Sequence, residues 1–289
     1  MADISASAVM KLRKMSSQGM MDCKKALAEA NGDVEKAMGI LRKKGLATLE
    51  KRSARETSEG LVVGRIAEDG KSATLVSLCC ETDFVAKNDD FVEVADTLLK
   101  YAEVCSSDKG VENLLETEVD GKKFSEIITD LVSKTGEKTE IGDFARFSLN
   151  GSGLISIYVH FNKKVGAMVK VETSDDSVAG SEQVVGIAND VAMHITATMP
   201  LALNKDSIDP KTIEKERAIY ADQVKGKPEN IIEKIVDGKL NKFFAENCLL
   251  NQPFVKDDSM TVEQVVAQAA KSAGGTAKIT DFIRISVGS

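Results

Sequence analysis

Apolar residues near the start of the chain recur every three to four positions, the spacing of helices that bury one face. Three such stretches follow one another, with Asp33 placed to cap the third and Gly45 placed to end it. The pattern predicts a three-helix domain over residues 1–46 and a linker over residues 47–59. A bundle this small has a thin core, so we expect it to rest on the next domain or on a partner.

Beyond the linker, the polar and apolar positions form a pattern that occurs twice. Residues 143–149 (DFARFSL) match residues 281–287 (DFIRISV) at an offset of 138. Further upstream, residues 60–62 (GLV) match residues 153–155 (GLI) at an offset of 93. Each copy contains two alternating, strand-like stretches joined by a turn, then two helical stretches and a last strand-like one. The chain therefore contains two copies of one module.

Each module is expected to be an α+β layer, in which helices cover one face of an antiparallel three-stranded sheet. The first module spans residues 60–150 and the second spans residues 151–289. The two offsets, 138 and 93, differ by 45 residues, which the second module must carry as an insertion. Residues 203–247 hold two helical stretches separated by Gly226-Lys227-Pro228, which predicts an antiparallel helical hairpin. Three roles are open for the hairpin: a plain structural arm, a surface for a partner, or the contact of a homodimer.

The charge and cysteine content exclude several classes of partner. The chain has 45 acidic and 38 basic residues, and a net charge of −7 repels phosphate backbones, so nucleic-acid binding is not expected. Five cysteines without a paired spacing argue against a disulfide framework and a zinc site, and they indicate a reducing compartment. The sequence contains no apolar run near the roughly 20 residues that cross a membrane, and its first fifteen residues lack signal-peptide features. We expect a cytoplasmic protein without a membrane partner.

Few residues point to chemistry. The sequence lacks a phosphate-binding loop and a dinucleotide fingerprint, so direct nucleotide binding and a cofactor are not expected. Tyr158 and His160 alternate on a strand and face the same way, which permits general-base work but offers no nearby nucleophile. His194 falls in an apolar helix and Cys23 on an apolar stripe, where packing is the better interpretation. An enzyme that uses Tyr158, His160 and Cys23 requires them to converge, and we assign no catalytic or metal-binding residue.

An acidic residue stands beside an aromatic one directly after an apolar strand, in residues 80–88 (CETDFVAKN). Two interpretations are open: Asp83 caps a helix while Phe84 packs into the chain's own core, or the pair is exposed and enters another protein. The matching residues 172–176 of the second module are polar and include no aromatic, which favours the exposed pair. Elsewhere, the adjacent Met20 and Met21 cannot both face a three-helix core, so at least one is expected to be exposed.

Six stretches, taken together and in order over almost the whole chain, resemble the bacterial elongation factor Ts family. They are MMDCKKAL (residues 20–27), NGD (31–33), TDFVAK (82–87), AMHI (192–195), KP (227–228) and NQPFV (251–255). The resemblance implies a guanine-nucleotide exchange factor that binds elongation factor Tu with GDP and promotes GDP release by disturbing the magnesium and phosphate site. It also implies a ubiquitin-associated-like helical domain, two related core subdomains and a helical hairpin, which agrees with the repeat found from the residues alone.

The resemblance also assigns contacts with the GTPase by position. The residues implied at its magnesium site are Thr82, Asp83, Phe84 and Val85. Further contacts are implied for Met20, Met21, Thr135, Gly136 and His160. A competing interpretation is an adaptor that holds partners without affecting nucleotide release. Mitochondria contain a related factor, but the unextended N-terminus favours the bacterial cytoplasm.

Overall fold

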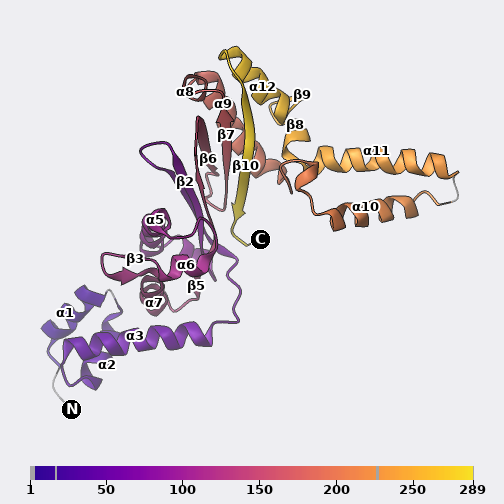
Figure 1. The fold of residues 1–289 in the computed structure, drawn as a ribbon. Helices are drawn as coiled ribbons and strands as arrows, with labels where there is room; N and C mark the ends of the chain where they lie inside the picture. Colours follow the sequence, from indigo (N-terminus) through magenta and orange to yellow (C-terminus); the bar gives the residue numbers. More distant parts are fainter. Residues whose placement is uncertain (1–3, 17, 226–227, 289) are drawn as a thin grey trace.

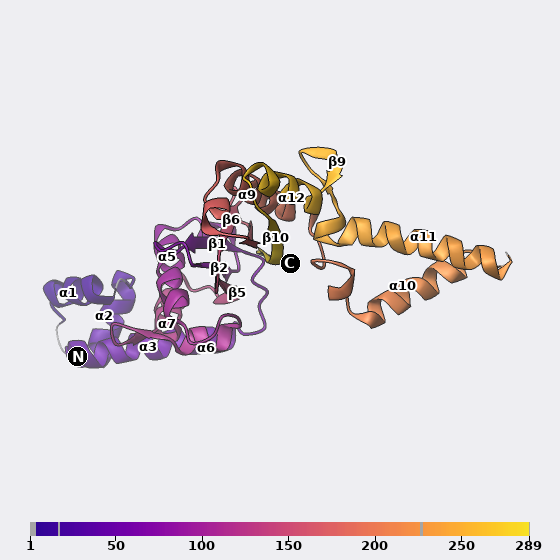
Figure 2. The same ribbon diagram turned by 45° about the horizontal axis from the view of Figure 1, so that its top comes forward.

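The computed structural model describes residues 4–16, 18–225 and 228–288, which form an elongated molecule (Figure 1). The N-terminal helices lie at one end, two sheet-containing modules lie in the middle, and a two-helix arm extends from the other end (Figures 1 and 2). The last described residue, Gly288, packs against Ser58, so the C-terminal end lies beside the start of the first module. Within the described ranges, no helix has both the length and the apolar character needed to cross a membrane.

Three helices form the N-terminal bundle: α1 (Ala6–Ser16), α2 (Met20–Glu29) and α3 (Val34–Lys51). Asp33 caps α3 as predicted, because its carboxylate accepts a hydrogen bond from the backbone N–H of Lys36 at 3.1 Å. The prediction that Gly45 ends this helix is wrong, since α3 continues to Lys51 and occupies the first part of the predicted linker. A Cβ at Gly45 would lie 2.7 Å from the carbonyl oxygen of Thr129 in the first module. The glycine permits a close helix contact instead of a helix end.

The bundle rests on the first module, as its thin core predicted. Helix α3 packs against α7 (Phe124–Thr135) of that module. The hydroxyl of Ser133 donates to the carbonyl oxygen of Leu41 at 3.3 Å, and the Gln18 amide donates to that of Asp130 at 3.3 Å. Hydrogen bonds and helix packing therefore join the two units directly.

The first module is a three-stranded antiparallel sheet with helices on one face. Its elements are β1 (Glu59–Ile66), β2 (Ser72–Cys80), α4 (Asp83–Ala86), α5 (Asp89–Val104), α6 (Val111–Glu116), β3 (Glu118–Val119), β4 (Lys122–Lys123), α7 and β5 (Thr139–Ser148). The strand order is β1-β2-β5, so β2 lies in the centre. Phe91 of α5 and Phe124 of α7 are fully buried in the core between the helices and the sheet. Amphipathic helices and alternating strands thus form one layered unit.

The second module repeats this architecture. Its elements are β6 (Gly153–Val159), β7 (Val165–Thr173), α8 (Asp176–Ala179), α9 (Glu182–Thr198), α12 (Val262–Ser272) and β10 (Ala277–Ser286). The strand order is β10-β7-β6, with β7 in the centre. Both offsets of the sequence repeat hold in space, since β10 follows β5 by 138 residues and α8 follows α4 by 93. The predicted α+β fold of two related subdomains is confirmed.

The sheets of the two modules pack face to face, so helices cover only the outer face of each. Seven buried residues fill the space between the sheets: Val62, Ala73, Leu75, Ala145, Ile155, Met168 and Ile285. Gly166 brings the sheets close together, because a Cβ there would lie 3.0 Å from a methyl group of Val62. The backbone N–H of Val62 also donates to the carbonyl oxygen of Lys163 at 2.6 Å. The sequence predicted each layer but not this contact between layers.

The insertion in the second module forms the projecting arm (Figure 1). Its elements are the short 3-10 helix η1 (Lys205–Ser207), α10 (Pro210–Asp222) and α11 (Glu229–Asn247). The 3-10 helix η2 (Leu249–Asn251), β8 (Pro253–Phe254) and β9 (Asp257–Thr261) follow the insertion and lead to α12. Val224, Val236 and Leu240 are buried between α10 and α11, which confirms the predicted helical hairpin. Pro228 immediately precedes α11, and the predicted break at Gly226-Lys227 lies outside the described residues.

Candidate functional site

The segment that follows β2 forms a single helical turn, α4, with Thr82 as its N-cap. The Thr82 hydroxyl accepts a hydrogen bond from the backbone N–H of Val85 at 3.4 Å, so the interpretation of Asp83 as the cap is wrong. Asp83 is the first helical residue and accepts a hydrogen bond from Lys87 at 2.6 Å. This hydrogen bond holds the pKa of Asp83 below its ordinary value, which keeps the exposed carboxylate ionised.

Phe84 points away from the molecule, and 83% of its surface is exposed. The next two residues, Val85 and Ala86, are buried against the first module. The interpretation in which Phe84 packs into the chain's own core is therefore wrong. A large apolar side chain left in water forgoes roughly 1.5–3 kcal/mol of favourable burial, which contact with another molecule would recover.

Glu137 holds the start of α4 from another part of the chain. Its carboxylate accepts hydrogen bonds from the Thr82 backbone N–H at 3.1 Å and from the Thr82 hydroxyl at 2.8 Å. Gly136 ends α7 with a left-handed backbone (φ 73°), and its backbone N–H donates to the carbonyl oxygen of Val132. The predicted contact residues Thr135 and Gly136 thus lie directly before the side chain that fixes α4. Sequence reasoning missed Glu137, because nothing local marks a residue whose partner is 55 positions away.

A second carboxylate, that of Glu81, joins α4 to the N-terminal bundle. Arg52, the C-terminal cap residue of α3, donates to both oxygens of Glu81 at 2.8 Å, and the backbone N–H of Lys138 donates at 2.6 Å. Burial acts to raise the pKa of Glu81, but the hydrogen bonds from Lys138 and Arg52 outweigh burial and lower it. Two carboxylates, those of Glu81 and Glu137, therefore hold the backbone directly before the exposed aromatic.

His160 lies in the turn between β6 and β7, which we call the β6–β7 turn (residues 160–164). Its ring nitrogen Nδ1 lies 3.0 Å from the Tyr158 hydroxyl, so the two side chains face the same way as predicted. The turn meets the beginning of β1, where Lys164 and Glu59 form an ion pair at 2.6 Å. Phe161 in this turn is 88% exposed and was missed by sequence reasoning. The available signal was an aromatic residue followed directly by the polar run Asn-Lys-Lys.

Met20 and Met21 are both exposed, at 51% and 62%. They form the first residues of α2, and the N-cap Gly19 precedes them. Met10 and Met15 of α1 are exposed as well, so the N-terminal bundle presents several flexible apolar side chains. This surface belongs to the bundle, whereas α4 belongs to the first module.

The residues considered for catalysis do not converge. Cys23 is fully buried in the core of the N-terminal bundle, while Tyr158 and His160 lie at the end of β6. His194 is also fully buried, and it accepts a hydrogen bond from the Val255 backbone N–H at Nδ1 and bonds the Gln252 side chain through Nε2. It is a satisfied core histidine, and burial lowers its pKa. The residues that the structure describes contain no cluster of histidine, cysteine or acidic side chains that could hold a metal ion.

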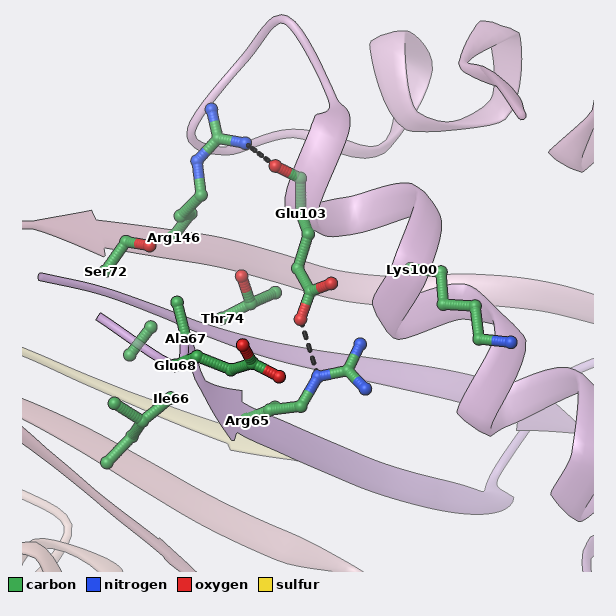
Figure 3. A pocket seen from close by; sticks show the side chains of 10 residues that line it. Arg65, Ile66, Ala67, Glu68, Ser72, Thr74, Lys100, Glu103 and Arg146 are labelled. Atoms are coloured by element: carbon green, nitrogen blue, oxygen red, sulfur yellow. Dashed lines mark hydrogen bonds and ion pairs between the residues drawn. The ribbon is translucent and has the colours of Figure 1, made fainter. Parts of the chain in front are cut away.

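A charged pocket lies near the β1–β2 turn, as Figure 3 shows. Arg65 bonds the Glu103 carboxylate at 2.5 Å, and Arg146 donates to the Glu103 carbonyl oxygen at 2.9 Å and to Asp108 at 2.8 Å. The two guanidinium groups are thus engaged within the protein. Because Ile66 pairs with Ala73 here and Glu59 pairs with Cys80 beside α4, the pocket lies at the opposite end of the hairpin from α4. We treat it as a structural cluster.

The fold therefore presents an exposed aromatic, Phe84, on an anchored one-turn helix, a geometry suited to contact with another molecule. A family model described as elongation factor TS matches residues 81–289. Proteins called elongation factor Ts from Clostridium kluyveri and Nitratiruptor sp. are 45% and 44% identical to this chain, over 99% of this chain and 93% of each relative. The relative from Clostridium acetobutylicum is 43% identical over 99% of this chain and 92% of its own length. The chain belongs to the elongation factor Ts family, the nucleotide exchange factors for elongation factor Tu in translation elongation.

Proposed function

We propose that α4 is the element that releases GDP from elongation factor Tu. Phe84 enters the GTPase beside its magnesium site, and Asp83 forms polar contacts there, so that the magnesium and phosphate contacts of the bound GDP are disturbed. The observation that carries this proposal is the 83% exposure of Phe84 on a turn held by Glu137 and Glu81. An aromatic that is presented rigidly loses little entropy on binding and is a typical interface hot spot.

The proposal gives the four predicted contact residues different roles, which their burial supports. The exposed Phe84 and the half-exposed Asp83 meet the partner, whereas Thr82 caps the turn and the buried Val85 anchors it. Thr135, Gly136 and His160 support or extend this contact from the neighbouring loops, and Met20 with Met21 forms a separate contact from the bundle.

The energetics of exchange follow from linkage. A factor that prefers the GTPase conformation with weakened nucleotide contacts shifts the population toward that conformation. Coupling free energies are reciprocal, so nucleotide that binds the GTPase again lowers the affinity of the GTPase for the factor by the same free energy. Release of the exchange factor needs no chemical step. We place this cycle in the bacterial cytoplasm, with no nucleotide or nucleic acid bound by the factor itself.

The test is stopped-flow release of labelled GDP from elongation factor Tu with the Phe84→Ala variant. Loss of a buried aromatic anchor costs on the order of 2 kcal/mol, so release should slow more than tenfold. Ser177→Ala is the matched control, because Ser177 occupies the second position of α8, as Phe84 does of α4. Unchanged release by folded Phe84→Ala protein would contradict the proposal. A tight complex that never accelerates release, even with the unaltered chain, would support the adaptor instead.

A further inference from the structure

Phe161, in the β6–β7 turn, is more exposed than Phe84. Its exposure is 88%, so its ring contributes little to the chain's own core. The ring instead stands against the His160 ring, with the two centroids 4.3 Å apart. Exposed apolar side chains are ordinary when isolated, so exposure by itself carries no conclusion. Two further features distinguish this one.

The first feature is the rigidity of the turn. Within it, the Lys163 N–H donates to the His160 carbonyl oxygen at 2.7 Å, and the Lys164 N–H donates to the Asn162 side chain at 3.0 Å. Strands outside the turn hold it as well: the Lys163 carbonyl oxygen accepts from Val62 of β1 at 2.6 Å, and that of Lys164 accepts from Val287 after β10 at 2.9 Å. The aromatic ring is therefore presented by a fixed backbone, which lowers the entropic cost of a contact.

The second feature is the position beside α4. The Lys164 side chain bonds Glu59 at the start of β1, and α4 packs against the same strand. Charge interactions connect the two loops further, since Lys164 adds to the effect of the Lys87 hydrogen bond in lowering the pKa of Asp83. The β6–β7 turn and α4 thus flank one end of β1, although 77 positions separate Phe84 from Phe161 in the sequence.

The internal repeat supplies an independent comparison. At the offset of 93, the β6–β7 turn corresponds to the β1–β2 turn, and Phe161 corresponds to Glu68. Glu68 lines the charged pocket (Figure 3). The strand pairing places this pocket at the opposite end of the β1–β2 hairpin from α4. In the first module, α4 has a phenylalanine and the β1–β2 turn has none; in the second module, the β6–β7 turn has one and α8 has none. The two segments that carry a phenylalanine, α4 and the β6–β7 turn, lie at the same end of β1.

We propose that Phe161 is a second aromatic anchor for the partner that α4 contacts, the GTPase elongation factor Tu. This proposal rests on the proposed function. Phe161 binds an apolar depression on the partner next to the place where Phe84 enters, and the pair fixes the orientation of the complex. Its main effect is on how long the complex lasts, because anchors of this kind act chiefly on the dissociation rate.

The experiment measures two quantities for the full chain: the dissociation rate of its complex with nucleotide-free elongation factor Tu, and the rate of labelled GDP release. Phe161→Ala should raise the dissociation rate at least tenfold, with a smaller effect on GDP release at saturating factor. Glu68→Ala, at the equivalent position of the other module, is the matched control and should change neither. Phe161→Asn provides a second variant with a turn-compatible residue, and thermal unfolding checks that both variants fold.

The outcomes separate the two proposals. An unchanged dissociation rate for both folded Phe161 variants overturns the second anchor, and it leaves the proposed function standing if Phe84→Ala still slows release. Faster dissociation with Phe161→Ala, together with full-speed release by Phe84→Ala, supports the anchor at Phe161 and overturns the role of α4. Effects equal to those of Glu68→Ala also overturn the anchor.

Discussion

The one-turn helix α4 of the first module and its counterpart α8 of the second have the same length and the same place after a central strand. Both bury a valine and an alanine at their third and fourth positions. They differ at the second position, where α4 has the exposed Phe84 and α8 has Ser177. Since α8 forms without an aromatic, folding of the turn does not require Phe84. The comparison teaches that the inner residues build the turn and the outer residue is available for function.

The two turns also differ in what holds them. Thr82 of the first module is bound by Glu137 from a distant loop. Asp175 of the second caps its own turn, accepting from the backbone N–H groups of Ser177 and Val178 at 3.0 Å each. Hydrogen bonds from Ser177 and Val178 lower the pKa of Asp175. Both turns therefore have a local cap, but a distant carboxylate also holds the cap residue of α4, whereas the distant contact of α8 is made by Ser174, before its cap, with the backbone of Thr276.

Moving the aromatic from α4 to α8 tests the comparison of these two turns, and it should have the largest effect on GDP release. Phe84→Ser should slow labelled GDP release from elongation factor Tu more than tenfold, because the proposed anchor, worth on the order of 2 kcal/mol, is lost. Adding Ser177→Phe to that variant should restore nothing, since α8 lies on the other module. Stopped-flow release measures both proteins. Recovery of the rate in the double variant would show that an aromatic on either turn suffices.

Removing the distant anchor should have the next largest effect. Glu137→Ala leaves the Thr82 N–H and hydroxyl without their acceptor, which should cost about 1–2 kcal/mol of unfolding free energy. GDP release should slow severalfold, by less than for Phe84→Ala, because the aromatic remains but is held loosely. Asp175→Ala, the control in α8, should cost about 1 kcal/mol of stability and leave release unchanged. Urea unfolding and GDP release, measured together, check both; full-speed release by Glu137→Ala would argue against a positioning role.

The long helices of the modules offer a comparison of buried polar residues. Tyr101 of α5 and His194 of α9 are 93 positions apart, and each side chain forms hydrogen bonds with the segment that follows its helix along the chain. The Tyr101 hydroxyl donates to the Lys122 carbonyl oxygen at 2.8 Å. Tyr101→Phe should therefore lower the unfolding free energy by about 1 kcal/mol, equally at pH 5.5 and pH 7.5. Burial raises the pKa of Tyr101 further above this range, so a loss that varies between these pH values would contradict the assignment.

His194 should add a smaller, pH-dependent term. Burial lowers its folded pKa below the ordinary value of 6.5, so the unfolded chain binds the proton more readily. The stability contributed by the neutral ring is complete above pH 6.5 and is lost as the pH falls from there toward the lowered folded value. Protonation also places a second donor against the Val255 N–H. Thermal unfolding from pH 7.5 to 5.5 should show a falling midpoint that is flatter in His194→Gln; equal slopes would exclude His194 as the cause.

Local signals predicted the elements well and the contacts between them less well. The strands, the long helices and the arm follow from periodicity, which depends on residues a few positions apart. The role of Gly45 was misjudged because a glycine that ends a helix and one that admits a neighbouring helix look alike in sequence. Spacing alone also left the direction of Phe84 undecided, since capping turns and contact turns use the same residue types.

By itself, the sequence determined the duplicated module and the inserted helical hairpin, and it singled out the segment that holds the proposed contact residues. These depend on patterns that repeat within the chain and on short motifs. Only the tertiary structure decided that Phe84 faces outward and that Glu137 holds α4. It also decided that the turn with Phe161 lies at the start of β1, the strand against which α4 packs. Those facts depend on how two sheets stack and which loops then meet. Stacking is set by side chains tens of positions apart, whose packing no local pattern encodes.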